Sequence, residues 1–140
     1  MKLDILANTA LLSTICIAAP VKAENPAHVK QLIETGECAG CDLGMANLSE
    51  AHLIGADLRN ANLKGANLTA ANLEGADLTV ANLKGANLTK VYASDASLND
   101  TNLTGVNFTG AKLYSTEMKG ATLVGTDFSG AKLYGAVVPN

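Results

Sequence analysis

The 140-residue chain has no tryptophan, and aromatic residues make up only 4% of it. With two phenylalanines and three tyrosines, it lacks the aromatic side chains of a conventional globular core. Only two histidines and three cysteines are present. This composition leaves few candidates for catalytic or metal-binding chemistry. It predicts an interior that is packed uniformly from small and aliphatic side chains.

Charged residues are also few and mixed in sign. Ten basic and thirteen acidic side chains give a net charge of −3, and no concentrated basic face of the kind that binds nucleic acid is evident. The carboxylates are scattered, and no serine stands in a nucleophile-elbow motif. We therefore predict that the protein is not an enzyme, that it does not bind nucleic acid, and that it has no catalytic residue, cofactor or metal site.

What the chain does contain is a five-residue unit, Ala-(Asn/Asp)-Leu-x-x, which recurs twenty times without insertion or deletion from Cys41 to Asn140. A period of five fits neither standard element, because the leucines would drift around a helix or alternate between the two faces of a strand. They can share one interior only if the backbone turns a corner in every unit. The pattern therefore predicts a coil with short, flat sides.

A longer period of twenty residues lies on top of the unit. The sequence Leu-Lys-Gly-Ala-Asn-Leu-Thr occurs at 63–69 and again at 83–89, and Gly-Ala-Lys-Leu-Tyr occurs at 110–114 and again at 130–134. Residues that lie directly above one another in a stack of coils would repeat in this way. We therefore expect four units, and hence four sides, in each turn of the coil.

Tandem Ala-Asn-Leu-x-Gly and Ala-Asp-Leu-x-x units resemble those of the pentapeptide repeat family, and they cover about 100 of the 140 residues. The resemblance implies an all-β fold, a right-handed quadrilateral parallel β-helix of about five coils. It also implies that the third residue of each unit and the small residue two places before it point inward. The remaining positions would look outward or shape the corners.

Two details of the repeat admit alternatives. The unit from Val91 to Asp95 has Ala93 in place of leucine but Val91 in place of alanine, for which we expect a kink or local adjustment rather than a boundary. The outward asparagines are stacked in rows, such as Asn62 above Asn82. They could form amide ladders along the stack, or they could simply serve the turns.

One outer side departs from small polar residues. It is the side whose inward residues include Leu53, Leu73 and Leu113, called side three below, and all three tyrosines fall on it. Aromatic residues beside lysines are typical of recognition surfaces, although tyrosine and lysine are also good exposed strand residues. We define the predicted partner-contact face, the tyrosine face, by Tyr92, Lys112, Tyr114, Lys132 and Tyr134.

The first residues resemble a secretory signal peptide. An uncharged run from Ile5 to Val21 is short for a membrane span, and Val21-Lys22-Ala23 supplies the small residue that signal peptidase needs. Cleavage after Ala23 would leave 8 basic and 12 acidic side chains, a net charge of −4. An uncleaved anchor is the alternative. We predict export to the periplasm or thylakoid lumen, with no membrane association after cleavage.

The chain is therefore divided into a signal peptide at 1–23, an N-terminal capping helix at 24–36 and the repeat β-helix at 37–140. Asn25 can cap the helix, Pro26 suits its first position, and Gly36 suits its end. The spacing of Val29, Leu32 and Ile33 predicts that they share one apolar face of this helix. Because the first coil of a solenoid exposes an apolar end and unpaired strand edges, we assign this helix as a lid. A partner-binding helix is the alternative.

Cys38 and Cys41 form a Cys-x-x-Cys motif at the start of the coil. In an oxidising compartment, a disulfide between them is plausible. The alternative is a pair of small buried thiols. Zinc is disfavoured because it needs four ligands and only two histidines remain to join the cysteines.

Two functions are compatible with these features. The first is a non-catalytic structural or interaction scaffold with an unidentified protein partner. The second, implied by members of the family that confer quinolone resistance, is a DNA mimic that inhibits or protects gyrase. Side four, the side whose inward residues include Leu58 and Leu78, carries the acidic row that such a mimic would need, formed by Asp57, Asp77, Asp100 and Glu117. Arg59 and Lys119 dilute this row. Because no helix closes the last coil, a homodimer formed end to end at the C-terminus is also predicted, although Pro139 argues partly against strand addition there.

Overall fold

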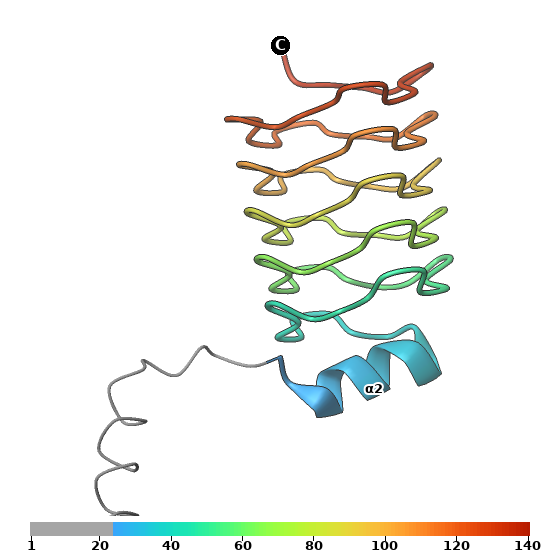
Figure 1. The fold of residues 1–140 in the computed structure, drawn as a ribbon, viewed down its shortest axis with the longest axis vertical. Helices are drawn as coiled ribbons and strands as arrows, with labels where there is room; N and C mark the ends of the chain where they lie inside the picture. The colour runs from blue at the N-terminus through green and yellow to red at the C-terminus, as the bar shows by residue number, and fades with distance from the viewer. Residues whose placement is uncertain (1–23) are drawn as a thin grey trace, which may run out of the picture.

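The computed structural model describes residues 24–140, so the predicted signal peptide lies outside the described residues. The described part consists of one helix, α2 (Pro26–Thr35), followed by a column of stacked coils. Figure 1 shows α2 lying across the first coil, with the C-terminus at the opposite end of the column. The repeats therefore build an elongated body whose two ends differ.

Parallel β-bridges hold neighbouring coils together, and each bridge joins residues that are twenty apart in the sequence. They continue in register from Glu37 to Val137, and the bridging residue is always the second of its five-residue unit. Around each bridge the hydrogen bonds form a short parallel ladder: Leu63 N donates to Asn82 O (2.8 Å), and Asn82 N donates to Ala61 O (2.9 Å). The twenty-residue period in the sequence is therefore the step from one coil to the next.

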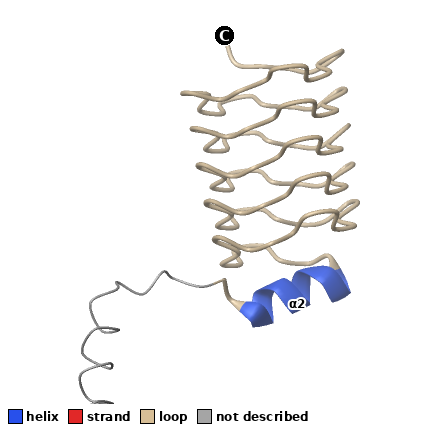
Figure 2. Cartoon of the chain, viewed as in Figure 1, coloured by secondary structure: helices blue, strands red, loops and turns tan. Residues whose placement is uncertain are grey.

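Each unit turns a corner directly after its bridge. Ala66 N donates to Leu63 O at 3.0 Å, which closes a four-residue turn whose third residue is Gly65. The φ of Gly65 is 67°, and a type II turn requires a positive φ at this place. Because each side has room for only one bridge, Figure 2 shows no regular strand in residues 24–140. The β-structure expected from the sequence is present as isolated parallel bridges.

The corner position is not always glycine. Val80 has a φ of 63° there although its side chain is β-branched. The left-handed conformation costs a non-glycine residue about 1–2 kcal/mol. The other non-glycine residues with positive φ are Met45, Glu50, Asn60, Ala70, Lys90, Asp95, Asp100 and Ser115. The regular corner is thus imposed by the stack even where the residue does not favour it.

Aliphatic side chains from the two inward positions fill the column. From Leu43 to Leu103, the leucines at the third position are at most 2% exposed. Two threonines, Thr101 and Thr116, replace alanine inside, and each hydroxyl donates to a backbone carbonyl, at 2.6 and 2.8 Å. Among the described residues, no buried side-chain nitrogen or oxygen lacks a hydrogen-bond partner. The interior of the described residues is therefore a single apolar column whose buried side-chain polar atoms are all paired.

The exchanged unit, Val91 to Asp95, continues the ladder without interruption. Val91 and Ala93 are both buried, at 0% and 1% exposure, so the larger first residue occupies the volume that the smaller third residue leaves. Ala93 N still donates to Lys112 O at 2.9 Å. The adjustment is local and does not form a boundary, as the sequence indicated.

Helix α2 begins and ends at the residues that the sequence predicted. The Asn25 side chain accepts hydrogen bonds from the first turn, Pro26 is the first helical residue, and Gly36 closes the helix with a φ of 71°. Leu32 is 1% exposed against the first coil. Ile33 is 54% exposed, so it does not belong to the inward face as its spacing implied. The helix therefore contacts the coil along a narrow stripe.

The last coil is less well covered than the others. Leu123, Phe128 and Leu133 are only partly buried, and Val138 is 46% exposed. The Phe128 ring stacks on Phe108 of the preceding coil, with the ring centroids 5.2 Å apart. Within residues 24–140, no helix has the length and apolar character needed to cross a bilayer.

Candidate functional site

The tyrosine face is built from the outward positions of side three. Tyr92, Lys112 and Lys132 occupy bridge positions and are joined in that order by parallel bridges, so they lie above one another in successive coils. Tyr114 and Tyr134 each follow the inward leucine of their unit and are also one coil apart. All five side chains of the predicted face are thus brought onto one side of the column.

These side chains are accessible to a partner. Tyr92 is 43% exposed, Tyr114 is 39% exposed, and Tyr134 in the last coil is 87% exposed. The Lys112 ammonium lies 4.5 Å from the centroid of the Tyr92 ring, which is a cation–π distance. The face therefore offers aromatic surface, phenol hydroxyl groups and positive charge, a combination suited to recognition of another macromolecule.

The neighbouring side four carries the acidic row. The Arg59 guanidinium donates to Asp57 through Nε (2.8 Å) and Nη2 (2.6 Å), and its Nε lies 3.9 Å from Asp77. These hydrogen bonds and the positive charge lower the pKa of Asp57 to about 2, and the same pair raises the pKa of Arg59. Arg59 therefore neutralises part of the row, as its position in the sequence suggested.

The asparagine rows serve the turns more than they form ladders. Asn67 Oδ1 accepts from the backbone N of Thr69 (3.1 Å) and from its hydroxyl (2.6 Å), and the same pattern recurs at Asn87. An amide-to-amide contact along the stack joins Asn67 to Asn47 at 3.4 Å. The asparagine oxygens are thus used within their own corners, as in Asx turns.

At the N-terminal edge, side chains accept hydrogen bonds from the backbone amides of the first coil. In later coils, backbone carbonyls of the preceding coil accept these bonds. Asp42 N donates to His28 Nδ1 (2.9 Å), and Asn47 N donates to a carboxylate oxygen of Glu24 (3.1 Å). One coil later, the equivalent amide of Asn62 donates to a backbone carbonyl instead. The segment from Glu24 through α2 therefore satisfies strand-edge donors that would otherwise be left unpaired.

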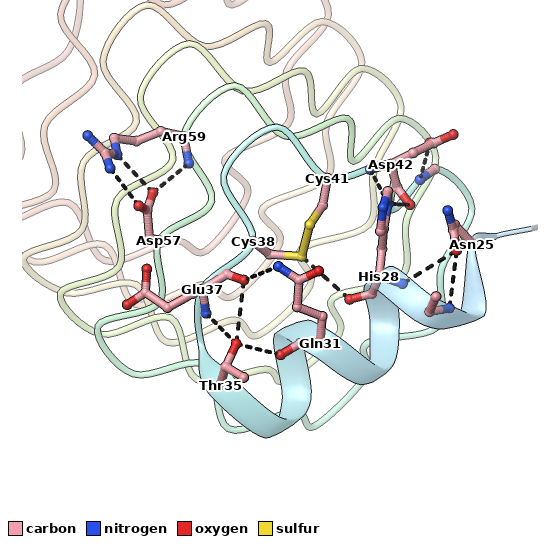
Figure 3. The surroundings of a disulfide bond; sticks show 12 residues. Asn25, His28, Gln31, Thr35, Glu37, Cys38, Cys41, Asp42, Asp57 and Arg59 are labelled. Atoms are coloured by element: carbon pink, nitrogen blue, oxygen red, sulfur yellow. Dashed lines mark hydrogen bonds and ion pairs between the residues drawn. A yellow bond between two sulfur atoms is a disulfide. The ribbon is translucent and has the colours of Figure 1, made fainter.

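Helix α2 also forms hydrogen bonds with the backbone of Glu37, which lies one unit before Asp42 on this edge. Glu37 N donates to the Thr35 hydroxyl (3.0 Å), and Gln31 Nε2 donates to Glu37 O (2.7 Å). Figure 3 shows these contacts beside a disulfide that joins Cys38 and Cys41, whose Cα atoms are 5.2 Å apart. The disulfide closes the first corner of the coil directly above the helix.

The C-terminal edge has no such replacement. Leu103 N donates to Thr122 O (2.9 Å) and Phe108 N donates to Asp127 O (2.7 Å). The corresponding amides one coil later, at Leu123 and Phe128, form no backbone hydrogen bond with any residue of 24–140. The column thus ends in open strand edges beside half-buried apolar side chains.

The sequence did not predict the hydrogen bond that the His28 ring accepts from the first coil. A lone histidine on a short helix gives no signal that its ring will accept a backbone hydrogen bond, because that depends on how the helix sits on the coil. No group of three or more His, Cys, Asp or Glu residues in 24–140 is placed to hold a metal ion.

Comparison with known proteins places the repeats in a family. The sequence model described as "Pentapeptide repeats" matches residues 46–85, 81–120 and 101–138, with eight copies, which is more than half of the chain. No curated protein sequence matches the chain. The family therefore rests on the repeats themselves.

Several solved structures are similar. QnrB1, a plasmid-mediated fluoroquinolone resistance protein, is 21% identical to this chain, with a TM-score of 0.57. The match covers 71% of this chain but only 59% of the QnrB1 chain. A pentapeptide repeat protein from the Arabidopsis thaliana thylakoid lumen is 34% identical over 74% of this chain and 69% of its own, with a TM-score of 0.45. Rfr23, from the cyanobacterium Cyanothece 51142, is 24% identical over 82% of this chain and 95% of its own, with a TM-score of 0.46.

The match to the repeat model and the coil of parallel bridges agree on one assignment. The similarity to QnrB1 supports the fold of this chain, but it does not indicate that the chain shares the activity of QnrB1. The chain belongs to the pentapeptide repeat family, whose members form right-handed quadrilateral β-helices.

Proposed function

We propose that this chain is an exported, non-catalytic scaffold that contacts a protein partner through the tyrosine face. Pentapeptide repeat proteins are generally structural or interaction proteins rather than enzymes. The observation that carries the proposal is the exposure of all three tyrosines of the chain on one side of the column. Partly exposed tyrosines contribute large contact area at low entropic cost, which is why they are enriched at interfaces.

Cross-linking tests the face. The tagged protein is cross-linked in its native compartment, and partners are compared between the unmodified protein and a Tyr114→Ser/Tyr134→Ser variant. Val124→Ser is the control, because Val124 is 68% exposed at the matching position on side one, the side whose inward residues include Leu63 and Leu83. The proposal requires that a partner is lost from the tyrosine variant and retained by the control. An unchanged set of partners would overturn it.

Export to the periplasm or the thylakoid lumen is part of the proposal. It is supported by the apolar run and Ala23 at the N-terminus, and by a buried disulfide in a protein that is otherwise poor in cysteine. The test is fractionation followed by N-terminal sequencing of the mature protein. A chain that starts at Glu24 in the exported fraction supports the proposal, and recovery of the whole chain from the cytoplasm contradicts it.

We assign α2 as the lid of the column. The assignment is supported by the side chains of Glu24, His28 and Thr35, which accept hydrogen bonds from first-coil amides, and by Leu32, which covers the apolar interior. A covered edge cannot add another strand, so the lid would keep copies from stacking at this end. None of residues 24–140 forms a lid at the opposite end, and we propose that two copies meet there as a homodimer.

The alternative function is a DNA mimic that acts on gyrase. The observation in its favour is the similarity of fold to QnrB1. Against it stands Arg59, which forms an ion pair with Asp57 at the N-terminal end of the acidic row. A supercoiling assay with purified gyrase separates the two functions. Inhibition or protection at micromolar concentration would favour the mimic over the exported scaffold.

A further inference from the structure

The tyrosine face carries two positive charges that lack acidic partners. Lys112 and Lys132 are joined by a parallel bridge, so their side chains project side by side from successive coils, about 4.8 Å apart at the backbone. Like charges directly opposite each other in a sheet are destabilising. Ion pairs in residues 24–140 involve Arg59 and Lys30, and neither lysine of the face takes part in one.

The surroundings do little to compensate these charges. Lys112 lies over the Tyr92 ring, which attracts a cation but does not neutralise it. The corner before Tyr92 holds a further exposed lysine, Lys90. The nearest acidic residue by register is Asp95 at the following corner, and it forms no ion pair with either lysine. Three exposed lysines, Lys90, Lys112 and Lys132, are therefore gathered on or beside one face of a chain whose net charge is −3.

We propose that the C-terminal half of the tyrosine face binds an acidic, extended segment of a protein partner. The inference rests on the proposed function and specifies the chemistry of its partner. Carboxylates of the segment would pair with Lys112 and Lys132, which removes the repulsion between the two ammonium groups. The exposed rings of Tyr114 and Tyr134 would cover the apolar part of the segment, and their hydroxyls would bond to its backbone.

A second pair of lysines provides a matched control. Lys64 and Lys84 are also one coil apart, also exposed and also without an ion pair in residues 24–140. They lie on side one, where no aromatic side chain accompanies them. General attraction of an acidic peptide to positive charge would involve both pairs equally, whereas a built site would involve the pair on the tyrosine face alone.

Intrinsic fluorescence gives a direct measure of binding. The chain has no tryptophan, and its three tyrosines all belong to this face, so tyrosine emission reports on the face without a label. The purified protein is titrated with a short polyglutamate peptide and, separately, with polylysine of the same length. We expect polyglutamate alone to change the emission, with an affinity that falls as the salt concentration rises.

Charge-removing variants then test the site. Lys112→Gln/Lys132→Gln should weaken polyglutamate binding by about tenfold or more, and Lys64→Gln/Lys84→Gln should leave it within about twofold. Equal weakening by both pairs would overturn the inference, as would no response to polyglutamate. Stronger binding to vesicles of anionic lipid than to the peptide would also overturn it, in favour of a membrane surface.

Failure of this inference can be told apart from failure of the proposed function. If the tyrosine variant loses a cross-linked partner while the lysine variant keeps it, the face is a contact surface but its partner is not recognised through acidic groups. If neither variant loses a partner, the contact face itself is wrong.

Discussion

The guanidinium of Arg59 donates two hydrogen bonds, at 2.8 and 2.6 Å, to the carboxylate of Asp57. The two residues lie on the same side of the column and are two positions apart in the chain. Both residues look outward because the inward residue Leu58 separates them. The geometry of one flat side is therefore sufficient to pair outward positions that flank an inward residue. The adjacent carboxylate of Asp77 in the next coil adds a longer contact, at 3.9 Å.

This pair predicts a specific acid sensitivity. The pKa of Asp57 is lowered from 3.8 to about 2 in the folded chain. Because the unfolded chain then binds the proton more readily, the stabilisation is complete above about pH 4 and is lost as the pH falls through about 2. Thermal unfolding of Asp57→Asn, measured between these pH values, should depend less on pH than that of the unmodified protein.

Glu74→Gln is the control for this measurement. It removes one negative charge from the neighbouring side three, and the Glu74 carboxylate forms no ion pair within residues 24–140. Its pH dependence should match that of the unmodified protein. If Asp57→Asn and Glu74→Gln behave alike, the Arg59 pair contributes nothing to the acid response.

The repeat made most of the fold predictable from sequence. Leucine at every fifth position requires a corner in each unit, and identical segments twenty residues apart, such as 63–69 and 83–89, predict which residues lie above one another. Once the register is known, it follows that Tyr114 and Tyr134 lie on the same side in neighbouring coils. These features are predictable because each depends only on position within the unit.

What could not be predicted depends on contacts that the repeat does not specify. The spacing of Val29, Leu32 and Ile33 suggested a single apolar stripe, but the helix axis crosses the first coil so that Ile33 is left exposed. The hydrogen bond from Asp42 N to His28 Nδ1 depends on that same crossing. The asparagine oxygens accept hydrogen bonds from the amide two residues along, as Asn67 does from Thr69 at 3.1 Å, and the repeat pattern alone left this open.

Adjacent residues of α2 test how the helix is docked. Leu32→Ala should lower the free energy of unfolding by about 2–5 kcal/mol, because Leu32 is buried against the first coil. Ile33→Ala should change it by no more than about 0.5 kcal/mol, because Ile33 is exposed. Urea denaturation followed by circular dichroism measures both. Similar losses for the two variants would show that α2 does not lie on the coil through Leu32.

The corner residues predict a stabilising substitution. Val80 has a positive φ and is 52% exposed, so Val80→Gly relieves backbone strain and gives up little burial. The strain relieved is about 1–2 kcal/mol and the added entropy of the unfolded chain costs about 0.5–1 kcal/mol, so we expect a net gain of up to about 1.5 kcal/mol.

The reverse substitution at another corner is the matched test. Gly85 has a φ of 69°, and an added Cβ would meet no atom within 4 Å, so Gly85→Val changes only the backbone preference. By the same two terms, it should lower the free energy of unfolding by up to about 1.5 kcal/mol. If both variants shift stability in the same direction, the cost of the corner conformation is not the controlling term.

The open end of the column predicts self-association. The amides of Leu123 and Phe128 have no backbone partner in residues 24–140, and Val138 is 46% exposed beside them. A second copy that meets this edge would cover the apolar groups. Sedimentation at micromolar concentration should therefore give a dimer for the unmodified protein and a monomer for Val138→Asp or Phe128→Asp, because a buried unpaired carboxylate opposes association.

Val124→Asp separates this effect from general charge repulsion. It adds the same charge to the same coil, but on the outward face of side one, where Val124 is 68% exposed. The control should remain dimeric, since its side chain does not point toward the end of the column. A monomer for the unmodified protein, or dissociation by Val124→Asp as well, would remove the open edge as the dimer contact. In the first case Pro139, which cannot donate a backbone hydrogen bond, would be a sufficient reason why no strand is added at this end.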